Sequence, residues 1–569
     1  MFQHDALSPS RVDHVFSSTS GDDVADAAAD ELNLHCNDAV HKVRSCRGEA
    51  AHDTGSQFWA RVIRGGRRDL GHCRAGGRRR CTAPMTAARP LDLHGLRPHV
   101  AVIGGGVSGL ATAYFLRRGK EPPHVTVIEA ADRLGGKVLT CQVGGFPVDT
   151  GPDSLLGQPA LLSLLDDLRL ADAIEPVAPL GFYVWSQGRL RRLPPGTLFG
   201  VPDRLIPLLR SRLLSPLGVL RAGLDLVLPR RRLPDDASVA ELLRPRFGTQ
   251  FFERLVEPLL GGIHAGCANE LSARSTVPDI DALVRANRSP YLAVRRLRHA
   301  ASRKSTKRVR PGMVTLHLGL GQLITALAGA LAETEIRLGT RATALERTAD
   351  GFQIDVEDGS ARATLRADAI VVATPAFVTA DLVESLAPTA ATELRDVPYV
   401  DVATITLTYP AAAIGRPLDA TGFLVPPAEG RLVVGCSWLS AKWPHLSSET
   451  VVVLRAMVGR AGDQRWASLD DATLIRRVHA ELAEAVGLSA EPLHTHLQRW
   501  PGALPQYTVG HQERLNKLDV ARAKVPGLYF TGAPYRGAGV ASCIAQAEET
   551  AARVLAGLPA LTQTQMAQP

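Results

Sequence analysis

The sequence predicts an α/β fold, in which a Rossmann-like domain is joined to a mixed-sheet domain that carries a helical insert. Three observations favour this fold. Residues 98–130 read as strand, glycine-rich turn, helix and strand, the β-α-β order of a Rossmann-like sheet. Residues 528–557 read as a further strand, turn and helix. Between them, residues 160–260 carry helical spacing and residues 400–460 carry β-rich runs.

The individual elements are predicted from the spacing of apolar residues. The buried runs HVAVI, HVTVI and AIVV predict strands that are covered on both faces. The segments SGLATAYFLRRG, LLSLLDDLRL, VAELLRPRF and LITALAGALAE carry apolar residues at helical spacing. IRLGTRATALER predicts one strand, and VATITLTY, RLVVGCSW and TVVVLRAMV predict three more. Between Leu205 and Leu228, leucine mixed with arginine and proline predicts amphipathic helices.

This pattern divides the chain into alternating segments. The Rossmann-like parts are residues 97–160, 311–390 and 501–557, the helical and substrate-binding region is 161–310, the substrate-binding sheet is 391–500, and the tails are 1–96 and 558–569. We expect both tails to be disordered, because the first lacks any sustained period. We also expect the natural protein to begin near Met85 and to function without residues 1–84. The alternative is a basic tail that binds a partner.

Composition argues against several classes of protein. The 569 residues are 45% hydrophobic and 21% charged, which is typical of a folded chain of about two to four domains. The chain shows neither a secretory signal nor a long apolar run, so we expect a cytoplasmic protein, with peripheral membrane contact as the alternative. The eight cysteines form no CxxC pair, so we expect neither disulfides nor a metal site. Basic runs at 61–80 and 303–310 dominate the net charge of +8; such runs are more often solvated loops than nucleic-acid sites.

The first chemical motif is Gly104-Gly105-Gly106-Val107-Ser108-Gly109, which satisfies GxGxxG between a strand and a helix. Its glycines permit a tight turn and the close approach of a pyrophosphate, which the N–H groups of the helix N-terminus would bind. Glu129 ends the second strand, where a carboxylate can accept hydrogen bonds from ribose hydroxyls. The arrangement predicts a nucleotide site.

Two further segments indicate which dinucleotide the site binds, FAD or NAD. The run Asp132-Arg133-Leu134-Gly135-Gly136-Lys137 resembles the DRxGG segment of the amine oxidase and protoporphyrinogen oxidase superfamily of flavoproteins. The run YFTGAPYRGAGV at 529–540 resembles the turn that lies beside the flavin in this superfamily, where a helix N-terminus favours the negative charge formed on reduction. The resemblance implies FAD, held by the three Rossmann-like parts. Residues 497–531 contain no cysteine, so we expect this FAD to be non-covalent.

Further blocks narrow the family. They are DTGPDS at 149–154, VEPLLGGIHAG at 256–266 with ELS at 270–272, WLSAKWP at 438–444, and PQY and GH within 505–511. These blocks resemble bacterial protoporphyrinogen/coproporphyrinogen oxidases, and the resemblance covers about residues 98–557. His264 stands where this family usually has Tyr, and Cys267 where it usually has Asp. Both positions are expected near the substrate.

The predicted cofactor-binding positions come from the motif and from the resemblance together. They are Gly104, Gly105, Gly106, Val107, Ser108, Gly109, Glu129, Ala130, Arg133, Gly135, Gly136, Lys137, Gly151, Pro152, Asp153, Ser154, Ala342, Trp443, Gly532, Ala533, Ala538, Gly539 and Val540. No catalytic residue can be assigned from the sequence. Arginines of the helical region, such as Arg210, Arg212 and Arg221, are candidates for binding the carboxylates of a substrate.

The resemblance implies FAD-dependent oxidation of coproporphyrinogen III to coproporphyrin III, or of protoporphyrinogen IX to protoporphyrin IX. The acceptor would be O₂ and the product H₂O₂, in haem biosynthesis. The expected partners are the porphyrinogen and O₂, without nucleic acid. Contacts with a membrane, a second copy and the next haem-pathway enzyme stay open. The alternative functions are those of a flavin amine oxidase and of a carotenoid desaturase-like oxidoreductase.

Overall fold

The computed structural model describes residues 97–194, 197–198, 200–303 and 312–558. The chain divides into two compact units, Met1–Ala88 and Arg89–Pro569, and every described residue belongs to the second. The expectations for residues 1–96, for most of the basic run at 303–310 and for residues 559–569 therefore lie outside the described residues.

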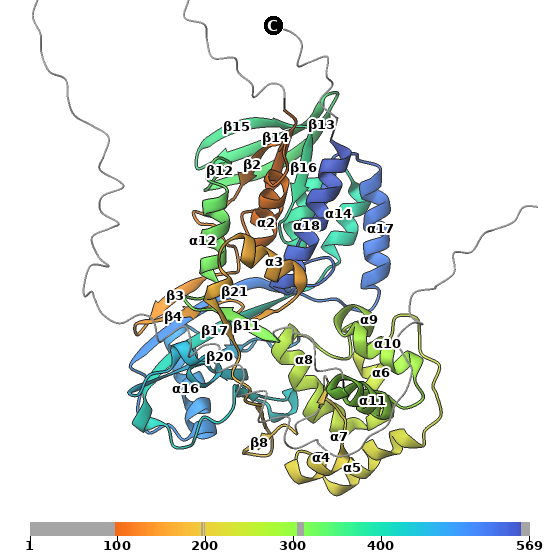
Figure 1. Ribbon diagram of the computed structural model, residues 1–569, viewed down its shortest axis with the longest axis vertical. Helices are drawn as coiled ribbons and strands as arrows, with labels where there is room; N and C mark the ends of the chain where they lie inside the picture. The colour runs from red at the N-terminus through yellow and green to blue at the C-terminus, as the bar shows by residue number, and fades with distance from the viewer. Residues whose placement is uncertain (1–96, 195–196, 199, 304–311, 559–569) are drawn as a thin grey trace, which may run out of the picture. The chain divides into compact units, whose positions relative to one another are not determined.

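A five-stranded parallel sheet forms the Rossmann-like domain, in agreement with the predicted fold class (Figure 1). Its strands, in spatial order, are β12 (Glu335–Arg337), β2 (His124–Ile128), β1 (His99–Ile103), β16 (Ala369–Val372) and β22 (Leu528–Phe530). All neighbouring strands in the sheet run parallel. Three separated stretches of chain thus build one sheet, and the order of strands reverses direction at β1.

Helices and a second small sheet cover the two faces of the parallel sheet. Val100 and Val102 of β1 pack with α2 (Val107–Arg117), α3 (Pro159–Asp167), α12 (Gly321–Ala330) and α18 (Val540–Gly557). Ala101 and Ile103 face the opposite way, because side chains alternate along a strand. They pack with α13 (Ala376–Val383), α14 (Pro388–Arg395), α17 (His511–Ala523) and the antiparallel sheet of β13 (Thr340–Thr348), β14 (Gly351–Asp358) and β15 (Ala361–Ala367).

A seven-stranded mixed sheet forms the core of the second domain. Its spatial order is β21 (His494–Pro505), β17 (Tyr399–Pro410), β20 (Val451–Val458), β19 (Val433–Trp438), β18 (Gly422–Leu424), β7 (Tyr183–Trp185) and β8 (Leu190–Arg192). Only the β18–β7 pair among these is parallel. Leu474, Val478 and Leu482 of α16 (Asp471–Val486) pack against the sheet. The β-rich prediction for residues 400–460 is confirmed by β17, β19 and β20.

The helical region lies beside this sheet and has a core of its own (Figure 1). It comprises α4 (Leu205–Ser211), α5 (Pro216–Gly223), α6 (Val239–Phe247), α7 (Thr249–Phe251), α8 (Glu257–His264), α9 (Ala273–Thr276), α10 (Pro278–Ala286) and α11 (Pro290–Arg303). The predicted amphipathic helices between Leu205 and Leu228 are α4 and α5. The start of α6 is fixed by Ser238 and Glu241, whose side chains each accept a hydrogen bond from the other residue's backbone N–H. None of the helices in the described ranges is long and apolar enough to cross a membrane.

Short elements connect these parts. They are the hairpin of β3 (Thr140–Val143) and β4 (Phe146–Asp149), the three-stranded sheet of β5 (Leu155–Leu156), β11 (Met313–Leu316) and β6 (Ile174–Pro176), the pair of β9 (Thr197–Leu198) and β10 (Val201–Pro202), and α15 (Leu439–Lys442). Helices predominate among the elements between residues 160 and 260, as the apolar spacing predicts, although the short strands β6 to β10 also lie there. One prediction of local structure was wrong. The single strand predicted for IRLGTRATALER is two strands, β12 and β13, separated at Gly339, whose φ is 65°.

One buried ion pair holds the helical region together. Asp225 is 0% exposed, and its carboxylate accepts hydrogen bonds from Arg246 Nε at 2.6 Å and from Ser289 Oγ at 2.6 Å. The backbone N–H of Tyr291 also donates to it, at 3.1 Å. The carboxylate thereby joins the end of α5, α6 and the start of α11.

Substitution Asp225→Ala should lower the free energy of unfolding by about 3–5 kcal/mol, because it leaves the Arg246 guanidinium buried without its counter-charge. Equilibrium unfolding in urea measures this loss. The matched control is Glu333→Ala, since Glu333 pairs with Arg117 but its side chain is 89% exposed; there the loss should be at most about 1 kcal/mol. Equal losses in the two variants would contradict the role given to Asp225.

Candidate functional site

The glycine-rich turn lies at the carboxyl end of β1, where strand order reverses. Gly104 has a φ of 110°, which favours glycine. A Cβ added at Gly109 would overlap the carbonyl oxygen of Gly104, so α2 starts directly against the turn. The residue before α2, Gly106, provides no side-chain cap, and the first turn of α2 contains no acid. The N–H groups that begin this helix are thus suited to an anion.

Glu129 reaches this turn from the end of β2. Its carboxylate accepts hydrogen bonds from the N–H of Gly105 at 2.5 Å and from the N–H of Ala131 at 2.8 Å. A carboxylate offers about four acceptor positions, so these two bonds leave capacity for hydroxyl donors. Ala342 lies nearby on β13, since the N–H of Thr340 donates to the carbonyl of Glu129 at 2.9 Å. The exposed Ala130 follows Glu129 directly.

The Gly135-Gly136 pair packs directly on the glycine-rich turn. The N–H of Gly135 donates to the carbonyl of Gly105 at 2.9 Å. A Cβ added at Gly136 would lie 3.2 Å from the Cα of Gly106. Arg133 holds its own loop, because its guanidinium donates to the carbonyl of Gly136 at 2.7 Å. Backbone therefore meets backbone here with no room for side chains.

Lys137 carries a half-buried positive charge from this loop to the seven-stranded sheet. Its Nζ donates to the carbonyls of Gly502 and Ala503 of β21, both at 2.6 Å. It also lies 5.5 Å from the ring centroid of Tyr399. Burial lowers the pKa of Lys137 to about 8. The sequence pattern marked this lysine, but it could not show that Lys137 joins two domains.

The C-terminal turn meets the start of α2. Gly532 has a φ of 118°, and a Cβ added there would lie 3.2 Å from Ser108 Oγ. After Gly532 and Ala533 the chain passes Ala538 and enters α18 at Val540, and the N-cap Gly539 again provides no side-chain cap. The predicted positions from both ends of the sequence are thus brought together.

Tyr507 and His511 support this turn, although neither was predicted as a site residue. The hydroxyl of Tyr507 donates to the carbonyl of Ala533 at 2.5 Å and accepts a hydrogen bond from the N–H of Gly537 at 2.9 Å. The His511 ring stacks on Tyr507 with centroids 4.2 Å apart, and its Nε2 lies 2.9 Å from the carbonyl of Tyr535. Burial lowers the pKa of His511 to about 4, so the ring is neutral near pH 7.

Asp153 belongs to a buried ion cluster. Its carboxylate lies 2.9 Å from Lys442 Nζ and 3.5 Å from Arg455, and Ser154 Oγ donates to it at 3.1 Å. Burial raises the pKa of Asp153, but Arg455 and Lys442 outweigh burial and hold this pKa below its usual range. Arg455 also donates to the carbonyl of Gly151, which precedes Pro152, at 3.0 Å. The GPDS block is thus tied to the seven-stranded sheet through protein groups.

Trp443 differs from the other predicted positions. It is 1% exposed and packs in a small apolar core with Leu439 and Val453. It therefore presents almost no surface to a ligand in this structure. Its neighbour Lys442, which was not predicted from the sequence, carries the ionic contact with Asp153.

The two departures from the family pattern lie at the end of α8, next to this junction. Gln506 Nε2 donates to the carbonyl of His264 at 2.9 Å, and Gln506 precedes the Tyr507 that holds the C-terminal turn. Burial lowers the pKa of His264 to about 4, so this imidazole is neutral near pH 7. Cys267 is a half-buried free thiol three residues further on. The backbone of His264 is thus linked through Gln506 to the segment that supports the C-terminal turn.

The candidate arginines of the helical region lie at the end of α4 and on α5. Arg221 donates to the carbonyls of Arg246 at 3.0 Å and Pro245 at 2.8 Å, which gives it a structural role. Arg210 and Arg212 are exposed at the end of α4. The guanidinium donors of Arg221 are thus used within the helical region, whereas Arg210 and Arg212 stay candidates for binding the carboxylates of a substrate.

The assembled turns fit a dinucleotide with a flavin. Two uncapped helix N-termini, a carboxylate at the end of β2 and three close backbone contacts surround one junction at the reversal of strand order. Such a crevice at the carboxyl ends of parallel strands is where α/β sheets bind dinucleotides. Cβ atoms added at Gly105, Gly109 and Gly135 would overlap neighbouring protein atoms, so the turns can pack this closely only with glycine.

Comparison with known proteins agrees with this geometry. Residues 107–555 match the flavin containing amine oxidoreductase family. The chain is 33% identical to coproporphyrinogen III oxidase of Bacillus subtilis over 457 residues, which are 79% of this chain and 96% of that protein. It is 30% identical to protoporphyrinogen oxidase of Bos taurus, over 81% of this chain and 99% of that protein.

A solved structure is similar over the same extent. A protein of Exiguobacterium sp. 255-15 superimposes with a TM-score of 0.71 and 29% identity, covering 80% of this chain and 98% of that one. The family match, the relatives and the fold all concern the part of the chain that contains the turns described above. The chain therefore belongs to the flavin containing amine oxidoreductases, and within them to the family of coproporphyrinogen III and protoporphyrinogen oxidases, with FAD as its cofactor.

Proposed function

We propose that this protein oxidises coproporphyrinogen III to coproporphyrin III in haem biosynthesis. One substrate molecule and three O₂ would give one porphyrin and three H₂O₂, which balances the six hydrogen atoms removed. The observation that carries this proposal is the similarity to bacterial proteins named coproporphyrinogen III oxidase, at 33% and 29% identity over 96% and 99% of their lengths. Protoporphyrinogen IX is the second candidate substrate, because of the bovine relative.

The residues of the glycine turns would hold FAD in three places. The N-terminus of α2 would bind the pyrophosphate, Glu129 the ribose, and the Gly532–Val540 turn with α18 the region of the flavin ring. Bound FAD supplies the two-electron acceptor that no protein side chain provides. We propose that no covalent bond forms. Burial raises the pKa of Cys543, the cysteine close to this turn, to about 11, so its thiol is a poor nucleophile.

The chain's own groups would set the polarity of the site. Lys137 keeps a positive charge up to about pH 8 and has two carbonyls but no described carboxylate as hydrogen-bond partners. This charge favours negative charge on whatever lies beside the glycine turns. His264 remains neutral at pH 7 and contributes apolar ring surface for a macrocycle.

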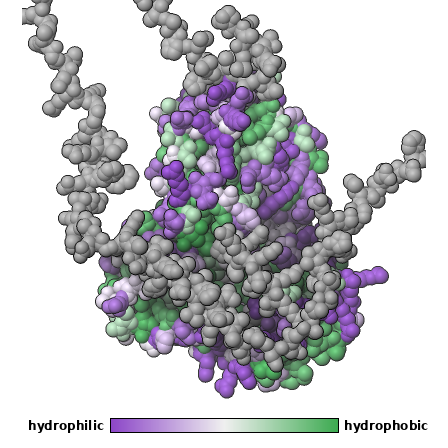
Figure 2. All heavy atoms as spheres, viewed as in Figure 1, coloured by the Kyte–Doolittle hydropathy of each residue, from purple (hydrophilic) through white to green (hydrophobic). Residues whose placement is uncertain are grey.

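We also propose that the protein is cytoplasmic and contacts membranes peripherally through α4 and α5. Ile206, Leu217 and Leu220 are 64%, 77% and 65% exposed on these helices. Arg204, Arg210 and Arg212 are exposed on the same segment. Figure 2 shows hydrophobic beside hydrophilic side chains at the lower end of the view, where Figure 1 places α4 and α5. Leucines next to arginines suit an anionic lipid surface. Contact with a second copy or with the next haem-pathway enzyme stays a prediction.

The cofactor assignment is tested with Glu129→Ala. Losing about two charge-assisted hydrogen bonds, each worth roughly 1.5–3 kcal/mol, should weaken FAD binding at least tenfold. Fluorescence titration of the apoprotein with FAD measures the dissociation constant. Glu333→Ala, which removes an exposed carboxylate, serves as control and should bind FAD like the unmodified protein. Unchanged affinity in Glu129→Ala would place the ribose elsewhere, and flavin that stays with acid-precipitated protein would contradict non-covalent binding.

The reaction is tested by anaerobic mixing of the oxidised protein with each porphyrinogen. Coproporphyrinogen III should bleach the flavin absorption at least as fast as protoporphyrinogen IX, and admission of O₂ should release H₂O₂ and fluorescent porphyrin. Benzylamine and putrescine serve as amine controls and should leave the flavin oxidised. If an amine bleaches the flavin while both porphyrinogens fail, the amine oxidase alternative replaces the proposal.

The membrane contact is tested with vesicles of phosphatidylserine and phosphatidylcholine. The protein should co-sediment with them at low salt, and replacing Leu217 and Leu220 together by Glu should abolish this. Leu493→Glu is the control, because Leu493 is 50% exposed away from these helices. If the double variant binds vesicles normally but changes its sedimentation mass, the leucines contact a second copy and the lipid assignment is wrong.

A further inference from the structure

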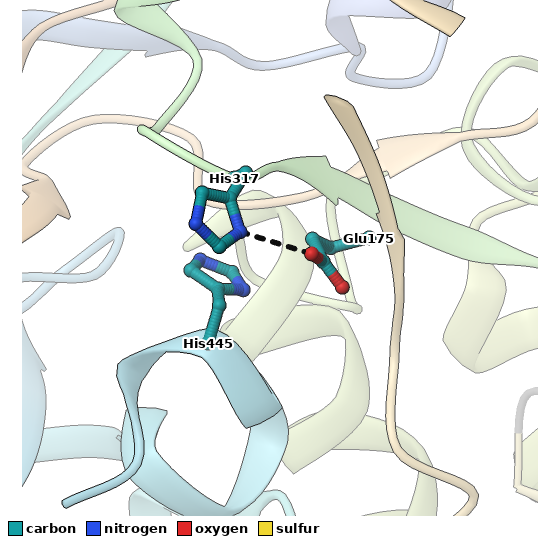
Figure 3. Close-up of side chains that lie close together, drawn as sticks. All are labelled: Glu175, His317 and His445. Carbon is teal, nitrogen blue, oxygen red and sulfur yellow. Dashed lines mark hydrogen bonds and ion pairs between the residues drawn. The ribbon is translucent and has the colours of Figure 1, made fainter. Parts of the chain in front are cut away.

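Three side chains of metal-binding type converge at a place remote in sequence from the glycine turns. Glu175 lies on β6, His317 follows β11, and His445 lies in the short helix η7 (Pro444–Leu446) (Figure 3). His317 Nδ1 is 3.0 Å from a carboxylate oxygen of Glu175, and the two imidazole centroids are 5.1 Å apart. One potential ligand atom of each residue lies within 4.8 Å of the others.

The backbone fixes two of these residues together. β6 pairs with β11 in antiparallel register, with Glu175 opposite Thr315, and the N–H of His317 donates to the carbonyl of Ala173 at 2.9 Å. The third residue is held from the other sheet, because η7 follows the buried Trp443 and Leu446 anchors its end. The convergence is therefore set by strand register and core packing rather than by flexible side chains alone.

A second observation indicates a missing partner. His445 Nδ1 is buried, and it has no hydrogen-bond partner among the described residues. Leaving such a polar atom unpaired is unfavourable, so native structures usually satisfy it with protein, water or an ion. In Figure 3 the His445 ring faces that of His317, with the Glu175 carboxylate beside both.

We propose that Glu175, His317 and His445 bind a divalent transition-metal ion, for which Zn²⁺ is the best match. Two imidazoles and one carboxylate are a common ligand set for Zn²⁺, with bonds of about 2.0–2.2 Å and a fourth position open to water. Tetrahedral bonds of that length place ligand atoms about 3.3 Å apart. The ligand atoms already lie within 4.8 Å of one another, and the His317 side chain is 55% exposed, so the core does not enclose it.

The bound ion would act as a structural clip. It would join the small β5–β11–β6 sheet to η7, next to the point where Lys442 pairs with Asp153. No redox step is involved, since Zn²⁺ keeps its charge. Because the ion binds the folded arrangement only, it should raise the unfolding temperature. No metal was predicted from the sequence, because that expectation rested on the spacing of cysteines, whereas these ligands are far apart in the chain.

The proposal is tested by equilibrium dialysis of the full-length flavoprotein with ZnCl₂. The unmodified protein should bind one Zn²⁺ more than His445→Asn and Glu175→Gln do at low micromolar free Zn²⁺. His299→Asn, which removes an exposed histidine of α11, is the matched control and should retain that ion. The difference between variants removes the background from the other histidines of the chain. Equal stoichiometry in the unmodified protein and both site variants overturns the proposal.

A second measurement does not depend on a variant that folds. Electron paramagnetic resonance of the unmodified protein with one equivalent of Cu²⁺ should show hyperfine splitting from two nitrogen ligands. A signal with no nitrogen splitting overturns the proposal. Flavin content and circular dichroism establish whether each variant is folded, and Zn²⁺ should raise the melting temperature of the unmodified protein and of His299→Asn but not of Glu175→Gln. A common shift in all three contradicts the clip.

Discussion

The structure depends on one contact, between the carbonyl of Gly104 and the first turn of α2. A Cβ at Gly109 would overlap the carbonyl oxygen of Gly104, so the end of the strand and the start of the helix pack together through backbone atoms. Because α2 lies this close, Ser108 comes within reach of Gly532, and the C-terminal strand β22 can add to the sheet beside β16. A larger residue at Gly109 would move α2 and thereby separate the two ends of the chain that share the site.

Charged side chains at the domain junction link the seven-stranded sheet to the Rossmann-like domain. Lys137 connects the glycine loop to β21, and Asp153 connects the block after β4 to Lys442 of α15 and Arg455 of β20. Charged groups are costly to bury, so each persists only where several donors and acceptors surround it. Such contacts are directional, and they fix the seven-stranded sheet against the Rossmann-like domain at defined atoms, which an apolar interface of similar area would do less specifically.

The sequence predicted the parts of the fold that have a simple period. The strands β1, β2 and β16 are continuous apolar runs, and α2 and α18 follow glycine turns, so local pattern and tertiary role agree. β21 was not predicted, because HTHLQRWPGALP has no alternation and the strand is half-exposed. β7 and β8 have three residues each and take their place only from pairing with β18 and with each other. The end of β12 before Gly339 could not be predicted from the local sequence, because it arises from β12 and β13 pairing in different sheets.

The site shows the same division between local and long-range information. Motif spacing selected Gly104–Gly109 and Glu129, which are close in sequence, whereas Lys137 and the remaining glycines came from the family resemblance. Tyr507, His511 and Lys442 act through hydrogen bonds across the fold, and the sequence offers only the PQY, GH and WLSAKWP blocks as a signal for them. Trp443 was selected with its block, whereas the structure buries it in an apolar core and gives the ionic contact with Asp153 to its neighbour Lys442. A sequence block thus marks a region of the candidate site. Packing decides which side chain of the block is buried in an apolar core and which makes polar contacts.

The distribution of charge around the junction bears on the substrate. Lys137 lies between the turns without a described carboxylate partner, while His264 and His511 are held neutral by burial. A cationic amine would meet a positive charge here, at an energetic cost that grows as water is excluded. An anionic group placed beside the glycine turns would instead be attracted to Lys137. The charge that ties β21 to the glycine loop therefore favours an anionic group over a cationic one beside the turns.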